Sequence, residues 1–468
     1  MNKQLLRKLP SVDALLSHPE AASLMETYGR QAVLDRARAV IDELRAKIQR
    51  DGPPSVAEND LALESVTSKI RLDLEARMAP SLRKVINATG VLMHSGLGRA
   101  VLAGEAVQAL ALVGEGYSNL AIDLETGRRG DRYSHVAGLL CELAGAEAAV
   151  VVNNNAAATV LILNTLAKGK EVIISRGQLV EIGGSFRMPE VMATSGAILR
   201  EVGATNKTHL RDYETVISER TGALMRVHHS NYRIVGFAEE PGIGELVEIG
   251  RKHQVPVIDD LGSGALIDLK DYGLETEPLI QTSLAAGVDV ACFSGDKLIG
   301  GPQSGIIVGR AAVVAQIKKN PLMRAFRVGK LTLAAMESTL KLFLNLEKIN
   351  ETHPLYRMLS LSLGAVERRA KKLAVRLLKA LPEKAIFSAE DSGSQVGSGS
   401  VPVETIPTKV LAVRPQDISS DALARNLRLH KPPIFARVYK DYILFDLRTI
   451  QPEEDIVVEK AILKILGP

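Results

Sequence analysis

The chain has 468 residues, of which 46% are hydrophobic and 24% are charged, and its formal net charge at pH 7 is +4. This composition excludes a disordered chain or a fibrous repeat, and the length predicts about two to three domains. The two cysteines, Cys141 and Cys292, exclude a disulfide scaffold and a four-ligand zinc site. No apolar run approaches the roughly 20 residues that span a bilayer, and the N-terminus lacks a signal peptide. We therefore expect a cytoplasmic protein without membrane contacts.

The first fifty residues have the periodicity of helices. Apolar residues recur at intervals of three or four, as at Val33, Ala37, Ile41 and Leu44. The segment also carries most of the chain's excess positive charge, and residues 51–54 (DGPP) after it predict a linker. Taken alone, such a segment is better explained by a helical dimerisation arm with a solvated face than by a binding function.

From about residue 85, short apolar runs alternate with helical stretches. The runs are AAVVVNNN (148–155), EVIIS (171–175), VPVIDD (255–260), VDVACFSGDK (288–297) and SGIIVGR (304–310). Such runs between amphipathic helices predict crossover units around a mainly parallel sheet that is buried on both faces.

The last part of the chain has a different pattern. A helix is predicted at residues 331–349, followed by long basic helices and strands such as TKVLAVR (408–414) and DYILFDL (441–447). Residues 388–404 (SAEDSGSQVGSGSVPVE) are rich in serine and glycine and predict a mobile loop. We expect an N-terminal helical domain (1–60), a linker helix (61–84), a large α/β domain (85–345) and a small C-terminal α+β domain (346–468).

Three motifs along the α/β domain carry candidate chemistry. Residues 153–159 (NNNAAAT) follow an apolar strand and open an Ala-rich helix, where free backbone N–H groups suit a phosphate. Residues 257–264 (VIDDLGSG) place a carboxylate at a strand end, where an open α/β sheet collects its ligand. Residues 293–297 (FSGDK) end another strand with Lys297. A phosphate cradle, a buried carboxylate and a lysine are the groups that pyridoxal 5′-phosphate (PLP) requires.

Each motif also has a plainer explanation. An asparagine run is usually a helix cap, a strand-end aspartate usually caps a loop, and a single strand-end lysine is seldom functional. The order of all three in one domain favours the cofactor site. The adjacent His228 and His229 point to opposite faces if they lie on a strand, which disfavours a shared metal.

A basic segment follows Lys297. No acidic residue lies between Asp296 and Glu337, whereas seven lysines and arginines do. If the segment is helical, Arg324 and Arg327 share a face and form a fork for an oxyanion. Another arginine, Arg99, lies in a glycine-rich turn. A solvated basic surface is the alternative to a binding site for a second, anionic substrate.

At these residues the sequence resembles the bacterial selenocysteine synthases (L-seryl-tRNA(Sec) selenium transferases), which are fold-type I PLP enzymes. The resemblance covers essentially the whole chain. It is carried by INATGVLMHSGLGRA (86–100), SRGQLVEIGGSFRMPEVM (175–192), HHSNYRIVGF (228–237), VIDDLGSGALIDL (257–269), FSGDKLIGGPQSGIIVG (293–309) and RAFRVGKLTLAAMESTL (324–340). One departure is residues 94–98 (HSGLG), where we expect His-Thr-Asn-Leu-Gly in the family.

The resemblance implies a role for each matching residue. Lys297 is the lysine that binds PLP, Asp260 is the partner of the pyridine nitrogen, with Asp259 less favoured, and Asp296 is the catalytic aspartate. Further contacts to the cofactor are implied for Asn154, Asn155, Ala156 and Ser294. The selenium donor is received by Arg99, Arg324 and Arg327, and the first fifty residues form a tRNA-binding domain.

The implied reaction converts L-seryl-tRNA(Sec) to L-selenocysteinyl-tRNA(Sec). Lys297 removes the α-proton, the β-hydroxyl leaves as water to give a PLP-bound aminoacrylyl-tRNA, and selenophosphate supplies selenium. Hydroxide is a poor leaving group, so a general acid is needed, and Asp296 is the candidate. The resemblance also implies a ring-shaped homodecamer that binds neither DNA nor a membrane.

Two other functions remain open from the sequence. A paralogous PLP-dependent lyase would eliminate water or ammonia from a small amino acid or amino-sugar acid, with Lys297 and Asp260 but without tRNA. An RNA-binding scaffold that has lost catalysis is the alternative that is not an enzyme. Aromatic residues make up 4% of the chain, and none is Trp, which predicts recognition of folded RNA by shape and backbone.

Overall fold

The computed structural model describes residues 2–51, 57–183, 186–229, 231–275 and 277–467. It divides into two units, Met1–Lys84 and Val85–Pro468. Most of the predicted linker at residues 51–54 lies outside the described residues. Within the described ranges, no helix is both long enough and apolar enough to cross a membrane.

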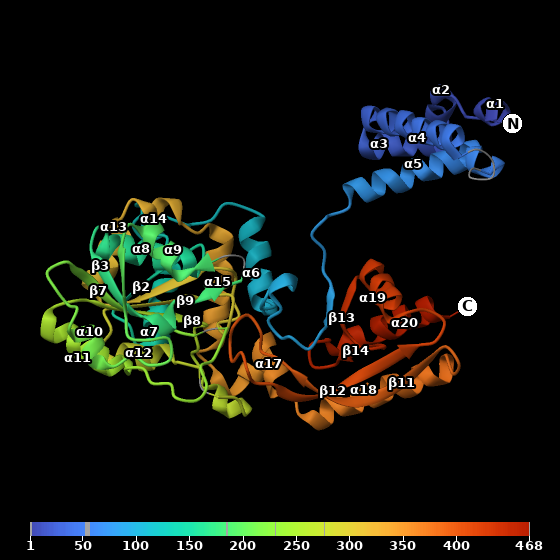
Figure 1. Ribbon diagram of the computed structural model, residues 1–468. Coiled ribbons are helices and arrows are strands. Elements are labelled where there is room, and N and C mark those ends of the chain that lie inside the picture. Colours follow the sequence, from blue (N-terminus) through green and yellow to red (C-terminus); the bar gives the residue numbers. More distant parts are fainter. Residues whose placement is uncertain (1, 52–56, 184–185, 230, 276, 468) are drawn as a thin grey trace. The chain divides into compact units, whose positions relative to one another are not determined.

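The N-terminal unit consists of helices, in agreement with the periodicity of its sequence (Figure 1). These are α1 (Asn2–Leu6), α2 (Val12–Leu16), α3 (Pro19–Tyr28), α4 (Arg30–Asp51) and α5 (Leu63–Met78). The buried face of α4, with Val33 and Ala37, shares one core with Ile70 and Leu74 of α5. The helix within residues 61–84, which we expected to act as a linker, is therefore packed into this unit.

The large sheet of the second unit has seven strands in the order β2-β10-β9-β8-β7-β3-β6. Their bounds are β2 (Ala148–Val152), β3 (Glu171–Ser175), β6 (Ile198–Val202), β7 (Thr221–Val227), β8 (Val257–Gly262), β9 (Val290–Ser294) and β10 (Gly305–Gly309). All neighbouring pairs are parallel except those that β10 makes with β2 and β9. The five predicted apolar runs are confirmed as strands, and a mainly parallel sheet is confirmed with them.

Helices cover both faces of this sheet (Figure 1). On one face lie α8 (Asn155–Ala167), α9 (Met188–Ser195) and α13 (Ala311–Lys319), and on the other α7 (Ser134–Ala144), α11 (Ile243–His253) and α12 (Ile280–Ala286). The remaining elements of this part are α6 (Gly104–Gly114), α10 (Leu210–Glu214), α14 (Leu322–Ala325), α15 (Lys330–Leu342), α16 (Ile349–Thr352), α17 (Pro354–Ser360) and the short pair β4 (Glu181–Ile182) and β5 (Phe186–Arg187). The single helix predicted at residues 331–349 is wrong beyond Leu342, because Asn345 leaves the helical conformation with φ −129°.

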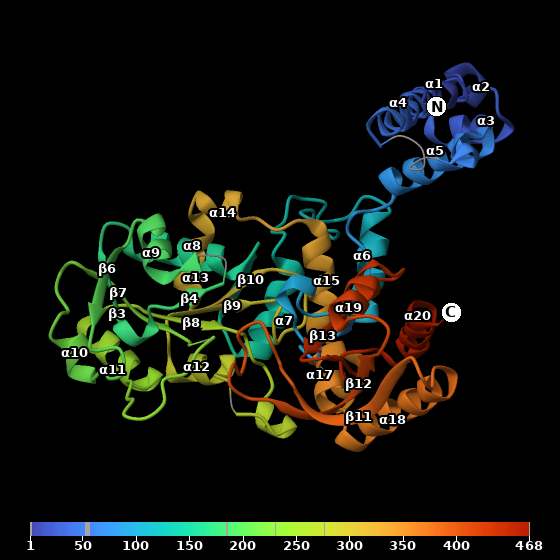
Figure 2. The same ribbon diagram turned by 45° about the vertical axis from the view of Figure 1, so that its right-hand side comes forward.

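The C-terminal part forms a second sheet with the order β1-β13-β14-β12-β11 (Figure 2). Its strands are β1 (Ile86–Ala88), β11 (Ala385–Ser394), β12 (Ile406–Pro415), β13 (Ile434–Tyr439) and β14 (Tyr442–Asp446), and its helices are α18 (Leu363–Ala380), α19 (Ser420–Leu429) and α20 (Asp455–Leu466). The strand β1 pairs in parallel with β13, and Ile86 is buried in the core of this small domain. The first residues after the N-terminal unit therefore belong to the small-domain sheet.

The loop predicted at residues 388–404 is wrong for residues 388–394. Residues 388–394 belong to β11, whose pairing with β12 runs from Ala385 to Ser394. Backbone pairing explains the strand, because it satisfies N–H and C=O groups whatever the side chains are. The chain then continues beside the large domain, where Leu92 N donates to Gln395 O (2.8 Å) and Val401 is buried.

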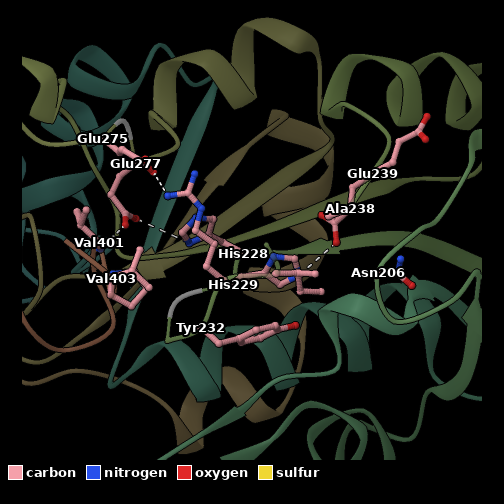
Figure 3. A pocket seen from close by; sticks show the side chains of 14 residues that line it. Asn206, His228, His229, Tyr232, Ala238, Glu239, Glu275, Glu277, Val401 and Val403 are labelled. Atoms are coloured by element: carbon pink, nitrogen blue, oxygen red, sulfur yellow. Dashed lines mark hydrogen bonds and ion pairs between the residues drawn. The ribbon is translucent and has the colours of Figure 1, made fainter. Parts of the chain in front are cut away.

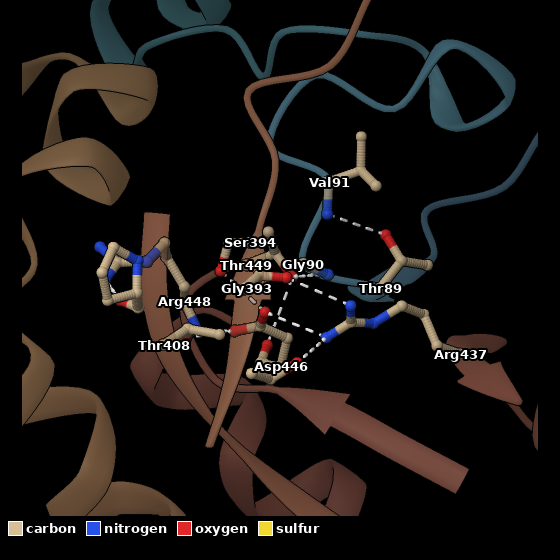
Figure 4. Close-up of polar contacts among 12 residues, drawn as sticks. Thr89, Gly90, Val91, Gly393, Ser394, Thr408, Arg437, Asp446, Arg448 and Thr449 are labelled. Carbon is tan, nitrogen blue, oxygen red and sulfur yellow. Dashed lines mark hydrogen bonds and ion pairs between the residues drawn. The ribbon is translucent and has the colours of Figure 1, made fainter. Parts of the chain in front are cut away.

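A buried carboxylate of this sheet lies against the turn that follows β1 (Figure 4). Asp446 is fully buried and accepts hydrogen bonds from Ser394 Oγ (2.8 Å) and Thr408 Oγ1 (2.9 Å). Gly90 has a φ of +77°, and a Cβ at this position would lie 2.8 Å from Asp446 Cγ. The turn that follows β1 thus requires glycine for its conformation and for its contact with Asp446.

We predict that Gly90→Ala destabilises the second unit by more than the cost of placing an alanine in the left-handed backbone conformation. The backbone strain costs about 1–2 kcal/mol, and displacing the hydrogen-bonded carboxylate adds about 1–3 kcal/mol. Calorimetric unfolding of the full chain measures the loss. Gly145→Ala is the matched control, because Gly145 has a φ of +73° and nothing lies within 4 Å of the added Cβ. Equal effects of the two substitutions would contradict the role of Asp446.

Candidate active site

Lys297 and Asp260 meet at one edge of the large sheet. Asp260 lies near the carboxyl end of β8, and Lys297 follows the parallel neighbour β9, so both side chains reach the crevice at the strand ends. Both residues are buried, with exposed fractions of 5% and 6%. They line a cavity of about 250 Å³, together with five other predicted site residues, Arg99, Asn154, Asn155, Ala156 and Ser294.

Asp260 is held by neutral donors. Its Oδ1 accepts a hydrogen bond from Asn155 Nδ2 (2.8 Å), and its Oδ2 accepts one from Thr159 Oγ1 (3.0 Å). Burial raises the pKa of Asp260, and these hydrogen bonds oppose the shift. Asp259 lies on the same strand but forms a bidentate pair with Arg226, at 2.8 and 2.6 Å. The two adjacent aspartates therefore have different partners, and Asp260 is the one that lines the cavity.

The N-terminus of α8 supplies backbone donors to the same cavity. Asn154 is the N-cap, and its side chain accepts the N–H of Ala157 (2.8 Å). The N–H groups of Asn155 and Ala156 precede the first intrahelical bonds and are available to an anion. Gly305 of β10 allows the backbone of Asn154 to pack closely against this strand, since a Cβ at position 305 would lie 2.5 Å from the carbonyl carbon of Asn154.

An ion pair lies beside the lysine. Asp296 Oδ2 accepts a hydrogen bond from Arg99 Nη1 at 2.6 Å, and Asp296 is 6% exposed. Arg99 has a left-handed backbone with φ +65°, and its N–H closes the turn onto His94 O (3.0 Å). Burial lowers the pKa of Lys297, and the Arg99 cation lowers it further, against the attraction of nearby carboxylates.

The other two predicted arginines lie apart from this cavity. The helix α14 ends at Ala325, so Arg324 and Arg327 do not share one helical face, and that expectation is wrong. Beyond the helix, Asn153 N donates to Phe326 O (3.0 Å), and Arg327 forms an isolated bridge with Val152. Because Phe326 and Arg327 make these contacts, the chain does not continue as a helix after Ala325. Both arginines are exposed, and Arg327 lies beside the turn that opens α8.

Sequence reasoning missed two residues that line the cavity with polar side chains, His228 and Gln303. His228 follows β7, the strand next to β8, and its N–H donates to Asp260 O (2.9 Å). In the sequence, the adjacent histidines raise only the question of a shared metal. The place of His228 at the end of a strand that neighbours the Asp260 strand is the signal that could have found it.

The mainly parallel sheet, with helices on both faces, defines a mixed α/β fold. A solved structure of D-glucosaminate-6-phosphate ammonia-lyase shares this fold, with a TM-score of 0.58 and 19% sequence identity. The match covers 84% of this chain and 98% of that chain. The predicted fold class is thereby confirmed.

Family comparisons are more specific. Residues 85–451 match the family model described as L-seryl-tRNA selenium transferase, and residues 6–45 match the one described as selenocysteine synthase N terminal. The L-seryl-tRNA(Sec) selenium transferase of Alkaliphilus metalliredigens is 48% identical over 463 residues, which is 99% of each chain. That of Nitratidesulfovibrio vulgaris is 48% identical over 474 residues, covering 100% of both chains. The chain therefore belongs to the L-seryl-tRNA selenium transferase family, and the resemblance found in the sequence is confirmed.

We predict that Arg99→Ala raises the pKa of Lys297, because it removes a cation that favours the neutral amine. At pH 8 the neutral fraction, and with it the reactivity of the amine, should then fall, by about tenfold if the pKa rises by about one. The measurement is reductive methylation of Lys297 in cofactor-free protein across a pH series, quantified by peptide mass spectrometry. Arg310→Ala is the control, since Arg310 pairs with Asp289 instead. An unchanged or lowered midpoint in Arg99→Ala would contradict the coupling.

Proposed function

We propose that this protein converts L-seryl-tRNA(Sec) to L-selenocysteinyl-tRNA(Sec), with selenophosphate as the selenium donor. The observation that carries the proposal is similarity over the whole chain to relatives with this name, in both units of the structure. The cavity that holds Lys297, Asp260 and Arg99 supports it with suitable chemistry. The match at residues 6–45 also disfavours a lyase for small molecules, which has no use for this N-terminal unit.

The residues of the cavity fit PLP as the cofactor. Asp260 is a buried carboxylate that forms no ion pair within the described residues, which suits a protonated pyridine nitrogen. Lys297 would bind the cofactor covalently, Asn155 and Ala156 would donate backbone N–H groups to its phosphate, and Ser294 would line the site. When bound, PLP accepts the electron pair that is left on a substrate carbon after proton loss.

The chain's own groups then account for proton transfer and anion binding. Lys297 has an amine whose lowered pKa favours the neutral form, which can accept the α-proton of the seryl group. Arg99 places a guanidinium beside it for the anionic selenophosphate, and Asp296 fixes the direction of that guanidinium. Arg324 and Arg327 are exposed cations outside this cavity, with Arg327 beside the turn that opens α8, and would receive the donor before it reaches Arg99.

We predict that purified protein forms selenocysteinyl-tRNA from seryl-tRNA(Sec) and selenophosphate, and that Lys297→Ala lowers the rate by about 10²–10⁴-fold. Asp260→Asn should weaken PLP binding by about ten- to a hundredfold, because a hydrogen bond to a charged group contributes about 1.5–3 kcal/mol. Chromatography of the released amino acid and cofactor absorbance are the two measurements. Free serine and a tRNA charged with another amino acid are the control substrates. Turnover of free serine alone would favour the lyase.

The N-terminal unit supports binding of the tRNA backbone. Several of its arginines are used within the unit, as shown by Arg36 with Asp73 (2.6 Å) and Arg71 with Glu20 (2.9 Å). On α4, by contrast, Arg30 and Arg38 are exposed and form no ion pair with the described residues. Exposed, unpaired cations on one helix are suited to phosphate contacts.

We predict that the double substitution Arg30→Ala and Arg38→Ala weakens binding of tRNA(Sec) and lowers its salt dependence. Each lost phosphate contact should reduce the slope of log K against log salt concentration by about 1. Filter binding at several salt concentrations measures both quantities. Lys8→Ala is the control within the same unit, because Lys8 Nζ lies 2.6 Å from Glu58 Oε1. An unchanged slope would exclude these arginines from the RNA contact.

We further propose that the chain assembles into a homo-oligomer, with the homodecamer implied by its family as the expected form. The support is an exposed apolar surface in and around α6. Five residues there are each more than half exposed: Val101, Val107, Leu112, Ile122 and Leu124. Large apolar side chains that stay exposed along one stretch of the chain are suited to contacts between subunits.

A further inference from the structure

His228 lies at the border of two cavities. It lines the 250 Å³ cavity of Lys297 and Arg99, and it also lines a neighbouring cavity of about 340 Å³ (Figure 3). Its backbone is fixed by the hydrogen bond to Asp260 O, and its side chain is 25% exposed. No step proposed above uses this imidazole, although it shares a cavity with the amine that takes the α-proton.

A second residue orients the ring. His228 Nδ1 is buried and has no hydrogen-bond partner among the described residues, and Glu277 Oε2 lies 3.7 Å from it. Glu277 is 4% exposed, and both of its oxygens are held, Oε2 by Ser263 Oγ (2.6 Å) and Oε1 by Val401 N (2.7 Å). A carboxylate fixed in this way favours the proton on Nδ1 and leaves the lone pair on Nε2.

We propose that His228, positioned by Glu277, carries one proton during the selenium transfer reaction. It takes this proton from the ammonium group of the seryl ester and gives it to the β-hydroxyl that leaves as water. The inference rests on the proposed function, and it adds a catalytic residue, His228, and a positioning residue, Glu277.

The atoms and electrons balance over the two transfers. In the first, an N–H bond of the ammonium breaks, its electron pair stays on nitrogen, and the proton binds Nε2. In the second, Lys297 takes the α-proton, and the pair from that bond forms the Cα–Cβ double bond. The Cβ–O bond breaks with its pair on oxygen, which takes the proton from Nε2 and leaves as water. The imidazole is neutral again at the end.

The surroundings of His228 favour this cycle. Burial lowers the pKa of His228, so the free imidazole is neutral and ready to accept a proton, while Glu277 opposes the shift and stabilises the protonated ring. The other charged groups that face it are His229, Arg226 and Asp259. Substrate α-amino groups have pKa values of about 7.7–8.0 in model compounds, above that of the buried imidazole, so the first transfer is uphill and the protonated ring is a good acid for the second.

Asp296 is less suited to the second transfer. Its Oδ2 accepts a hydrogen bond from the Arg99 guanidinium at 2.6 Å, which orients both side chains toward each other. A proton on either oxygen of Asp296 would neutralise the charge that holds the arginine that we assign to the selenium donor. His228 has no such second task, because within the described residues its ring forms no hydrogen bond.

The test compares pH profiles of kcat/KM for the holoenzyme with seryl-tRNA. In the wild type, kcat/KM should fall as the pH drops below the pKa of His228, because the protonated ring cannot accept a proton. In His228→Gln this fall at low pH, the acid limb of the profile, should disappear, and the plateau value of kcat/KM should be about 10²–10⁴-fold lower. Glu277→Gln should move the limb to lower pH, because it removes the carboxylate that raises the pKa. His253→Gln, at an exposed histidine of α11 that lies near Glu214 instead, is the control and should keep the wild-type limb.

Two measurements separate a chemical role from a structural one. Histidine hydrogen–deuterium exchange, followed by mass spectrometry on cofactor-free protein, reports the titration of His228 itself and should show a lower midpoint in Glu277→Gln. Added imidazole should restore the rate of His228→Ala but not of His228→Gln, whose side chain fills the space. Cofactor absorbance verifies that each variant is loaded.

Failure of the proposed function and failure of the role of His228 give different results. If the wild type makes no selenocysteinyl-tRNA, the proposed function itself fails. If the wild type is active and His228→Gln keeps its rate and acid limb, the proton-carrying role is wrong. The role is also wrong if His228→Ala binds the cofactor but added imidazole does not restore its rate. The positioning role of Glu277 is wrong if the titration midpoint of His228 is unchanged in Glu277→Gln.

Discussion

The structure depends on burying a lysine amine among carboxylates at the edge of one sheet. A charged group without water is costly unless fixed partners replace its hydration. Each carboxylate near Lys297 has such partners: Asp260 has Asn155 and Thr159, Asp296 has Arg99, and Glu277 has Ser263 and Val401. Because these partners come from α8, the turn after β1 and the segment after β11, the site requires segments that are far apart in the second unit.

The small domain reaches this site through the chain between β11 and β12. Ser398 Oγ donates to Met93 O (2.6 Å), in the turn that leads to Arg99, and Val401 N donates to Glu277. The segment 398–401 thus supports Arg99 through the turn at Met93 and His228 through Glu277. A displacement of the small domain would change the position of both side chains while the strands that carry Lys297 and Asp260 stayed in place.

The sequence was most informative where side chains determine the structure. The strands β2, β3, β8, β9 and β10 are continuous apolar runs because helices cover both faces of their sheet, and this pattern also located Asp260 and Lys297. It failed for residues 388–394, where backbone pairing with β12 builds a strand from serine, glycine and acidic residues. It failed again at Arg327, because a bridge to Val152 ends the helix, and no local pattern encodes that distant contact. His228 and Glu277 are separated by 49 positions, so only the fold brings them together.

Net charge is a poor measure of what this protein can bind. A formal charge of +4 in 468 residues argues weakly for an RNA partner, and the excess in the first fifty residues argues only slightly better. The structure divides those cations into two groups. Arg36 is paired with Asp73 inside the helical unit, whereas Arg30 and Arg38 face solvent and pair with no carboxylate in the described part of the chain. Only the second group can release counterions on contact with a phosphate. The number of exposed, unpaired arginines therefore limits the affinity, and a nearly neutral chain can still present a basic surface on one helix.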